Sequence, residues 1–469
     1  MRFHAAITFS FTRHGKFKIF PKRMIVKLRD LFPPAVCQFA FVLLAAGFAG
    51  CGRETDGTGG LARIREINQK EIVSKQGIFA ITGATVVDGT GRPAVADGCV
   101  IVSNGTITAV GKRGDIGIPG DAQIVNAAGL TLLPGFIDSH FHLDGVHGLP
   151  ARFLQNGVTS LRDPGAWIEM YDGERNSGQP VPRLFLAGPH LDMFPPAYPR
   201  DAYVVRDADE AVREVNRLAD RGASVIKVYY RLPPAIIREV CKAAHARGLP
   251  VTAHLETTEA REAIEAGLDG VEHITSFGLS LVPQIEGEKY RQMVMADNNA
   301  RKQGRYEVWK NIDPDDPMTD SLGIFLRNRG TFVSPTLGAF EYQAAAGQPF
   351  DTARLEGFIK MKKITGKLHR AGARIVVGSH SMIPYAETGW AFQREMELLV
   401  DSGLSPAEVI SAATLQNARF FRIDDRLGSI EKGKQADLVL IKGDPLKNIS
   451  VTRNVSKVML NGVWVKQAE

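Results

Sequence analysis

Between residues 133 and 420, short apolar runs rich in β-branched residues alternate with amphipathic stretches. The runs include GFIDSHFHL, SVIKVYY, PVTAHL and RIVVGSH, and the stretches between them include DADEAVREVNRLADRG and PAIIREVCKAAHARG. Apolar runs of this length indicate buried strands, and the spacing in the longer stretches indicates helices. Eight strand and helix units in succession predict an α/β fold, a (β/α)8 TIM barrel.

The segments on either side of this region have a different pattern, in which apolar and polar residues alternate between glycine, asparagine and aspartate turns. Residues 77–132 contain VSNGTITAV, whose Asn-Gly pair between alternating runs predicts a hairpin. Strand-like runs return in residues 421–469, as in ADLVLIK and VSKVMLNGVWV. We therefore expect the two ends of the chain to build one small β-sandwich beside the barrel.

Residues 283–329 are too long for a simple connection and are rich in charged side chains. Long insertions after a barrel strand lie over the mouth of the barrel, so we expect a lid that contacts substrate. Farther along, Ser405, Pro406 and Glu408 have the spacing of a capping box with proline in the first turn, which predicts a helix start.

The first 50 residues have the pattern of an export signal. Basic residues precede the run FAFVLLAAGFAGCG, which is too short and too interrupted to span a membrane. Its FAGC ending resembles the bacterial lipoprotein signal, in which the cysteine, here Cys51, is acylated. We expect residues 1–50 to be removed and residues 51–76 to tether an exported protein, facing the periplasm or exterior, to a membrane. A plain signal peptide and an uncleaved anchor are the alternatives.

Charge argues against a polyanion as a partner of the body of the protein. The net charge of the 469 residues is +6, but the first 50 residues carry eight basic side chains and one acidic one, or +7, which leaves −1 for the rest. No basic field remains to attract nucleic acid. Beyond the signal, the cysteines after Cys51 are Cys99 and Cys241, which offer one candidate pair and no disulfide framework. The oligomeric state stays open.

Histidines stand at the ends of several predicted strands. His140 and His142 follow the first strand and, with Asp138, point to one face because strand side chains alternate. A single histidine in such a place is more often structural than a ligand. Imidazoles that end several strands of one barrel would meet at its carboxyl face, and together they predict a site for zinc or a related divalent metal. The others are His254, His273 and His380, and Lys227 lies on the fourth strand.

Long stretches of the sequence resemble the amidohydrolase superfamily, above all its imidazolonepropionase-like and metal-dependent prolidase and carboxypeptidase branch. The motifs are LLPGFIDSHFHLDG, GVTSLRDPG, VIKVYY, VTAHLETTEAREAIEAGLDGVEHITSFG and the closing GSIEKGKQADLVLIKGDP. The resemblance begins near residue 77 and extends over nearly all of the remaining chain. It implies the same barrel and sandwich, two divalent metal ions, zinc being expected, and hydrolysis of C–N bonds.

The resemblance also assigns roles to the candidate residues. His140 and His142 resemble the ligands of the more buried metal, and His254 and His273 those of the second. Lys227 matches a lysine that carbon dioxide carboxylates in this branch, so that it bridges the two ions. We expect Asp138 to orient an imidazole and Tyr229 to touch substrate, and we expect a structural role for His190.

One position departs from the family pattern. Where the branch has an aspartate at the end of the eighth strand, which binds metal and accepts a proton from the attacking water, this chain has His380. Neutral imidazole can coordinate or accept a proton, but it cannot do both with one lone pair. Glu387 is a nearby acid in the sequence that could compensate.

Three functions follow from this reasoning. The leading hypothesis is a metal-dependent hydrolase of a small amide, cyclic amide or peptide-like substrate, with His380 as the proton acceptor. A binding protein that keeps its metal but has lost turnover through His380 is the second. Lactone hydrolysis or decarboxylation on the same scaffold is the third, because a fold by itself does not fix a reaction.

Overall fold

The computed structural model describes residues 63–74, 76–344 and 350–466. Leu61–Glu469 forms one compact unit. The predicted signal and Cys51 lie outside the described residues, so export and lipid anchoring stay predictions. Within the described ranges, no helix is long and apolar enough to cross a membrane.

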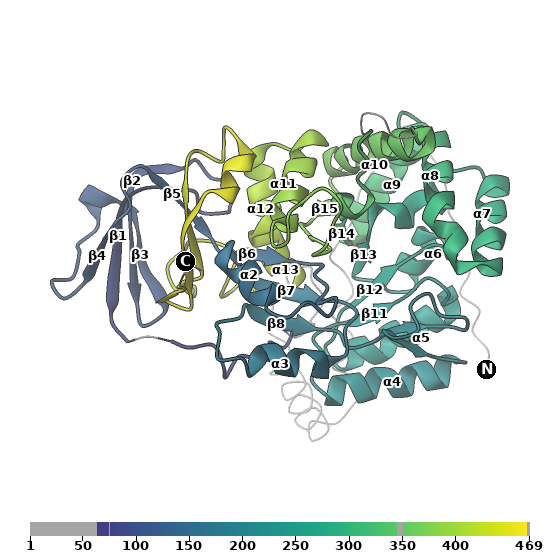
Figure 1. Ribbon diagram of the computed structural model, residues 1–469, viewed down its shortest axis with the longest axis horizontal. Coiled ribbons are helices and arrows are strands. Elements are labelled where there is room, and N and C mark those ends of the chain that lie inside the picture. Colours follow the sequence, from purple (N-terminus) through teal and green to yellow (C-terminus); the bar gives the residue numbers. More distant parts are fainter. Residues whose placement is uncertain (1–62, 75, 345–349, 467–469) are drawn as a thin grey trace, which may run out of the picture. The chain divides into compact units, whose positions relative to one another are not determined.

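Parallel strands form the centre of this unit (Figure 1). β6 (Phe136–Asp138), β7 (Val158–Asp163) and β8 (Arg183–Leu186) make one sheet. The second sheet has the order β10-β9-β11-β12-β13-β14-β15. Its strands are β9 (His190–Asp192), β10 (Ala202–Val204), β11 (Ile226–Val228), β12 (Val251–His254), β13 (Gly270–Glu272), β14 (Phe332–Ser334) and β15 (Arg374–Ile375).

Two backbone hydrogen bonds join these sheets into a barrel. Ser224 N donates to Leu186 O over 2.7 Å, between β8 and β11. Ser139 N donates to Val377 O over 3.0 Å, so the chain beyond β15 returns to β6. The predicted (β/α)8 barrel is therefore confirmed, with β9 and β10 as additions after the third strand. Almost all strand residues are buried, as expected where helices cover a parallel sheet.

Helices surround the barrel. α4 shows why they form, since Asp207 caps its first turn and Ala211, Val215 and Leu218 place an apolar stripe against the strands. The predicted capping box of α12 is confirmed in both directions between Ser405 and Glu408. The helices are α2 (Leu149–Gln155), α3 (Asp172–Arg175), α4 (Ala208–Asp220), α5 (Pro234–Ala246), α6 (Ala260–Glu265), α10 (Thr352–Arg370), α11 (Ala391–Asp401), α12 (Pro406–Ala413) and α13 (Leu415–Phe420).

The insertion after β13 is helical. It consists of α7 (Gln284–Ala296), α8 (Arg301–Asn311) and α9 (Pro317–Arg329). Tyr290 and Val294 of α7 pack against Tyr229 and Tyr230, which follow β11. Short 3₁₀ turns complete the chain: η1 (Arg113–Asp115), η2 (Ile168–Tyr171), η3 (Ile274–Ser280), η4 (Asn298–Ala300), η5 (Leu337–Phe340) and η6 (Ile449–Arg453).

Both ends of the described chain contribute to a β-domain, as predicted. Its core is its own and includes Ile81, Val100 and Leu438. The predicted hairpin lies at Asn104 and Gly105, whose φ angles of 49° and 80° suit a tight two-residue turn. The eight strands form one continuous sheet: β1 (Ile78–Val86), β2 (Val95–Ser103), β3 (Thr106–Lys112), β4 (Gln123–Asn126), β5 (Leu130–Pro134), β16 (Leu438–Lys442), β17 (Val455–Leu460) and β18 (Val463–Trp464).

The β-domain and the barrel share a buried ion-pair network at Arg183, the first residue of β8. Its guanidinium lies 2.8 Å from Asp437 and 3.0 Å from Glu66, and all three side chains are at most 3% exposed. Both carboxylates hold the pKa of Arg183 above its usual range, although burial opposes this. One cation thus connects three separate parts of the chain.

We expect Arg183→Met to lower the free energy of unfolding by about 3–5 kcal/mol, because Asp437 loses its buried arginine and Glu66 keeps only Arg426, 3.0 Å away. Urea unfolding followed by circular dichroism measures the change. Arg206→Met is the matched control, since Arg206 pairs with Glu210 on the surface with 81% of its side chain exposed. Its expected effect is much smaller than that of Arg183→Met, because solvent screens an exposed ion pair. Equal losses in the two variants would contradict a structural role for the network.

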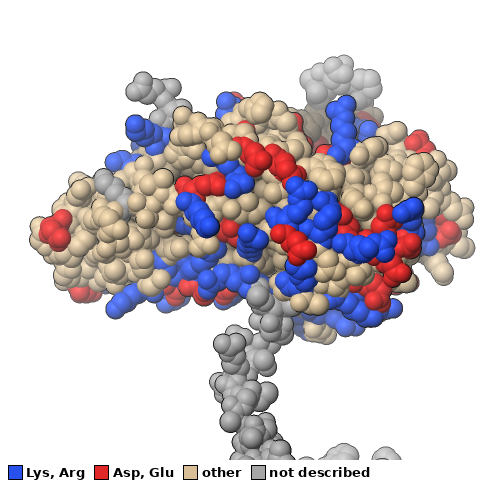
Figure 2. Space-filling model, turned by 90° about the horizontal axis from the view of Figure 1, so that it is seen from below, with Lys and Arg blue, Asp and Glu red and all other residues tan. Residues whose placement is uncertain are grey.

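Charged side chains of both signs are interspersed on the face that carries α3 and α4 (Figure 2). Several are paired within or next to these helices, as in Arg217 with Glu214 and Arg247 with Asp220. Pairing of this kind agrees with the near-neutral charge of the sequence after residue 50.

Candidate metal centre

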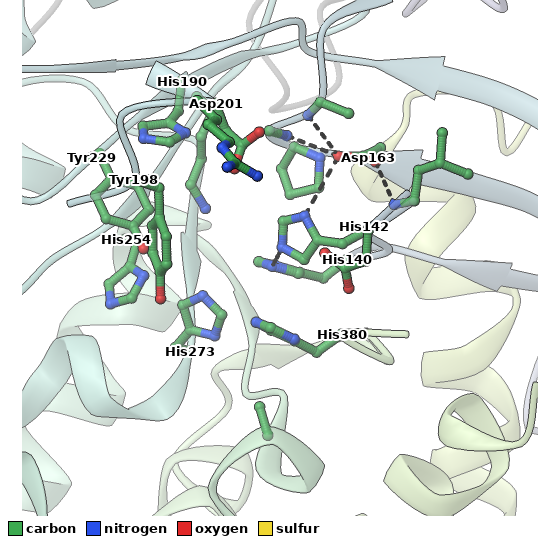
Figure 3. A pocket seen from close by; sticks show the side chains of 18 of the residues that line it. His140, His142, Asp163, His190, Tyr198, Asp201, Tyr229, His254, His273 and His380 are labelled. Atoms are coloured by element: carbon green, nitrogen blue, oxygen red, sulfur yellow. Dashed lines mark hydrogen bonds and ion pairs between the residues drawn. The ribbon is translucent and has the colours of Figure 1, made fainter. Parts of the chain in front are cut away.

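A cavity of about 570 Å³ opens at the carboxyl ends of the barrel strands (Figure 3). Lys227 and Tyr229 line it from the fourth strand. Asp144, Asp163, Asp201, Arg200 and Arg305 bring charge to its wall. The histidines that line it are His140, His142, His190, His254, His273 and His380.

His140 and His142 face each other after β6. The Nδ1 atom of His140 lies 2.7 Å from Glu272 Oε2, and Nδ1 of His142 lies 3.6 Å from Asp163 Oδ1. An ionised carboxylate only accepts hydrogen bonds, so Nδ1 of His140 carries the proton and its Nε2 offers a lone pair. The 3.6 Å between His142 and Asp163 is an ion-pair distance, and the negative charge favours the same tautomer in His142. The two Nε2 atoms are 3.0 Å apart. Two lone pairs at that separation repel each other unless a cation or a proton lies between them.

His254 and His273 are held in the same manner. Nε2 of His254 lies 3.1 Å from Glu256 Oε1, and its buried Nδ1 has no hydrogen-bond partner among the described residues. Thr336 donates its hydroxyl hydrogen to Pro335 O, so its oxygen accepts from Nδ1 of His273, 2.6 Å away. One nitrogen of each ring is thereby fixed, and the other is free to act as a ligand.

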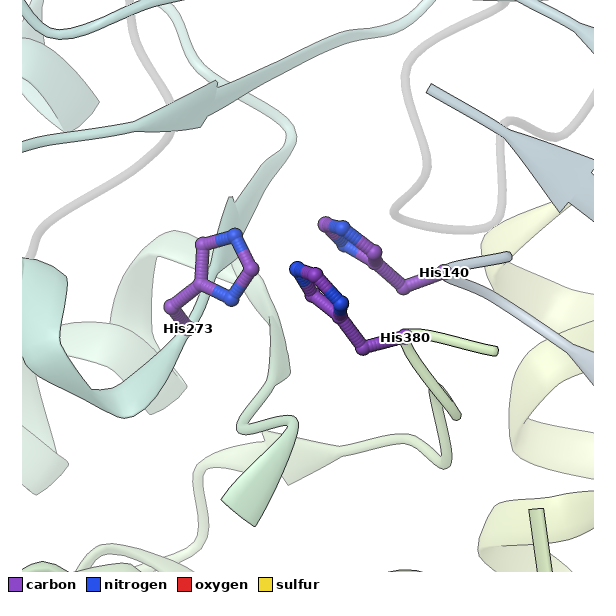
Figure 4. Close-up of side chains that lie close together, drawn as sticks. All are labelled: His140, His273 and His380. Atoms are coloured by element: carbon purple, nitrogen blue, oxygen red, sulfur yellow. The ribbon is translucent and has the colours of Figure 1, made fainter. Parts of the chain in front are cut away.

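His380 lies beside these rings. One nitrogen from each of His140, His273 and His380 falls within a group whose atoms lie at most 4.8 Å from one another (Figure 4). Gly378 allows this approach, since a Cβ atom there would lie 2.6 Å from Cβ of His140. Both His273 and His380 have positive φ angles, 65° and 58°, which are uncommon outside glycine and concentrate at functional sites.

Lys227 lies at the floor of the cavity with 3% of its side chain exposed, and its Nζ is 3.9 Å from Glu272 Oε1. Burial lowers the pKa of Lys227 to about 7, although Glu272 opposes the shift. A lysine with this pKa is partly neutral near pH 7, and the neutral amine is the form that reacts with carbon dioxide.

These residues fit a divalent metal. Burial lowers the pKa of His254 to about 4, so its ring is neutral near pH 7, as a ligand must be. The unpartnered Nδ1 of His254 and the facing Nε2 atoms of His140 and His142 are the donor atoms that a cation would satisfy. Imidazole nitrogen is a preferred ligand of zinc.

The family comparison agrees with this geometry. The family model described as "Amidohydrolase family" matches residues 131–465, which are most of the chain. The chain belongs to the amidohydrolase family. This membership confirms the predicted resemblance and, for the family in general, divalent metal binding.

This amidohydrolase is similar to several known proteins in part of its sequence or in its fold. An N-acyl-D-aspartate deacylase of Alcaligenes xylosoxydans xylosoxydans is 36% identical over 123 residues, which are 25% of this chain and 24% of the relative. The chain thus spans about a quarter of that curated relative. A putative prolidase from Bifidobacterium longum has a similar fold, with TM-score 0.64 and 23% identity over 83% of this chain and 94% of the other. A Xaa-Pro dipeptidase has TM-score 0.63 and 20% identity over 82% and 99%.

In this amidohydrolase, Asp138 has contacts other than those expected. We expected Asp138 to orient an imidazole, but its Oδ1 accepts the backbone N–H groups of His140 and Ser379, and Glu272 holds the ring instead. Burial raises the pKa of Asp138 to about 6. Asp138 therefore ties together the ends of the first and eighth strands.

The other sequence candidates divide between the cavity and the surface. Tyr229 lines the cavity, as a substrate contact would. His190 lines it too, with a buried Nε2 that has no partner among the described residues, and its ring centroid is 4.4 Å from that of Tyr229. Glu387 is exposed and is absent from the cavity lining, so it gives no support to compensation for the missing aspartate.

Sequence reasoning missed the carboxylates that hold the rings. Asp163 also accepts hydrogen bonds from three backbone amides and from Tyr171, and these contacts and His142 keep its pKa low despite burial. Their positions in the sequence were the available signal. Asp163 ends the second strand, Glu272 directly precedes His273, and Glu256 is two residues after His254.

Proposed function

We propose that this protein is a metal-dependent hydrolase that cleaves the C–N bond of a small amide, cyclic amide or peptide-like substrate. The observation that carries the proposal is the set of four imidazoles in one cavity, each with one nitrogen held and the other available: His140, His142, His254 and His273. His254 has a buried Nδ1 without a partner among the described residues, and the Nε2 atoms of His140 and His142 face each other, as expected of nitrogens that a cation would satisfy.

In the loaded protein, His140 and His142 would hold one ion and His254 and His273 a second, with carboxylated Lys227 between them and zinc as the expected metal. When bound, such ions polarise a scissile carbonyl and lower the pKa of water toward about 7. The chain itself supplies the rest. Tyr229 offers a hydroxyl to substrate, and burial and His142 lower the pKa of His380 to about 3, so its ring is neutral near pH 7 and keeps a lone pair beside the other rings.

The relatives support a C–N bond as the target. One is named as a deacylase of an N-acyl amino acid, and one fold neighbour as a dipeptidase. Amides of amino acids are therefore the first compounds to try. Met170, Phe340 and Leu143 add apolar surface to the cavity wall, which suits a side chain or acyl group beside the polar centre.

We expect the purified protein, loaded with zinc, to hydrolyse at least one member of a panel of dipeptides, N-acyl amino acids and cyclic amides. Chelation should abolish turnover and zinc should restore it, because no other group on the cavity wall activates water as strongly. Released amine, detected with a fluorogenic reagent, measures the reaction. Turnover that survives complete metal removal would contradict the proposal, and hydrolysis confined to lactones would replace it with the lactonase hypothesis.

A further inference from the structure

Each of the four histidine rings contacts a partner side chain through one nitrogen. The four partners differ in the part of the fold that keeps them in place. His140 is held by Glu272 of β13, His142 by Asp163 of β7, and His273 by Thr336, two residues after β14. Those partners belong to barrel strands or to the residues next to them. His254 is held by Glu256, and in the described structure the side chains that fix Glu256 come from the insertion after β13.

Glu256 is buried, with 1% of its side chain exposed. Its Oε1 lies 3.1 Å from Nε2 of His254 and 3.2 Å from Nη2 of Arg305, which is on α8. Its Oε2 accepts the hydroxyl hydrogen of Tyr290, which is on α7. Two insertion helices therefore meet at the one carboxylate that determines which nitrogen of His254 faces the cavity.

Both insertion side chains are themselves fixed. Nε of Arg305 donates to Arg301 O over 3.0 Å, its guanidinium carbon lies 5.3 Å from the centroid of the Phe340 ring, and 12% of its side chain is exposed. Tyr290 is 6% exposed and packs against Tyr229 and Tyr230. Tyr290 and Arg305 thus hold both oxygens of the Glu256 carboxylate, one of which lies beside Nε2 of His254.

We propose that the insertion is a structural part of the metal centre: Tyr290 and Arg305 are positioning residues that, through Glu256, aim Nδ1 of His254 into the cavity. The inference rests on the proposed metal centre and adds a role to the lid expected from the sequence. It makes the two ion sites unequal. The site that contains His254 depends on the insertion, and the site of His140 and His142 depends on the barrel alone.

We therefore expect substitutions in the insertion to weaken the binding of one metal ion and not of the other. In Tyr290→Phe and Arg305→Met, Glu256 loses one contact and His254 gains rotational freedom, so one of two divalent ions should bind about 10–100-fold more weakly, the usual cost of losing a residue that orients a ligand. The other ion should keep its affinity, because Glu272 and Asp163 are untouched. Zinc titration by calorimetry and cobalt absorption, which reports ligand geometry, measure both sites without any need for turnover.

Tyr306→Phe is the matched control. Tyr306 is on α8, is 8% exposed and donates its hydroxyl hydrogen to Phe340 O over 3.1 Å, so it loses a buried hydrogen bond of the insertion without touching Glu256. Both ions should bind Tyr306→Phe as they bind the wild type. If Arg305→Met does not fold, Tyr290→Phe and Glu256→Gln carry the test.

Three outcomes would overturn the inference. Unchanged affinity for every ion in Tyr290→Phe and Glu256→Gln would show that the contacts do not position His254. An equal loss in Tyr306→Phe would show that any loosening of the insertion has the same effect. A parallel loss at both sites would contradict the selective dependence. A wild type that binds no divalent ion would instead overturn the metal centre itself, so the two failures can be told apart.

Discussion

Replacing His380 by alanine is expected to lower kcat by about 10²–10⁴-fold, the usual size of a general acid–base contribution. One nitrogen of His380 lies within 4.8 Å of a nitrogen of His140 and of His273, which puts the ring beside the expected metal site. The five histidines that remain around the cavity keep their partners, so the metal content should change little. Steady-state kinetics on the best substrate and metal analysis of the same sample measure both quantities.

His369→Ala is a suitable control, because His369 is a histidine of α10 that pairs with Glu408 away from the cavity. It should leave kcat unchanged. If His380→Ala instead loses one ion together with its activity, His380 is a ligand and the proton acceptor must be another group. An active wild type that is indifferent to the substitution would leave His380 with a structural role.

A second substitution at this position, His380→Asp, distinguishes the enzyme hypothesis from the binding-protein hypothesis. If the wild type binds metal but hydrolyses nothing in the panel, His380→Asp, which restores the carboxylate of the family, should produce turnover. That result would favour the binding hypothesis for the natural chain. Loss of activity in His380→Asp from an active wild type would show that the imidazole has become the working group.

Lys227→Ala is expected to reduce the metal content from two ions to one or none, with loss of turnover. Four neutral imidazoles leave two nearby cations without a negative charge between them, and carboxylated Lys227 would supply that charge. Metal analysis after gel filtration measures the ratio of metal to protein. In the wild type, mass spectrometry under native conditions should find the mass of one carbon dioxide on the peptide that contains Lys227.

Added acetate or propionate should restore part of the metal content of Lys227→Ala, because a small carboxylate can occupy the space that the side chain leaves. Lys242→Ala is the control, since Lys242 is an exposed residue of α5 paired with Glu239. A Lys227→Ala variant that keeps two ions with unchanged affinity would show that the bridge is absent and that the two sites are independent.

Much of the fold could be predicted from the sequence because its signals are local. Apolar runs that alternate with amphipathic stretches indicate strands and helices wherever they occur, since the periods of 2 and 3.6 residues come from backbone geometry alone. The hairpin at Asn104 and the capping box at Ser405 are set by a few adjacent residues, and both are present. The histidines could be assigned to one face because carboxyl ends of parallel strands meet at one end of a barrel.

The contacts that make the site specific could not be predicted in this way, because they join residues far apart in the chain. Glu272 stands next to His273 but holds His140, 132 positions earlier. Asp138, whose position suggested that it orients a ring, instead ties two strand ends. Which side chain reaches which ring depends on strand register and rotamers, and these are settled only when the barrel closes.

The sequence by itself determined that this chain is a barrel with a β-domain and that its histidines gather at one end. Only the tertiary structure decided which nitrogen of each ring faces the cavity, and that the orientation of His254 depends on Tyr290 and Arg305 of a distant insertion. The physical reason is that secondary structure follows from short-range periodicity, whereas the direction of a buried lone pair is fixed by a hydrogen-bond partner that only the folded chain brings near.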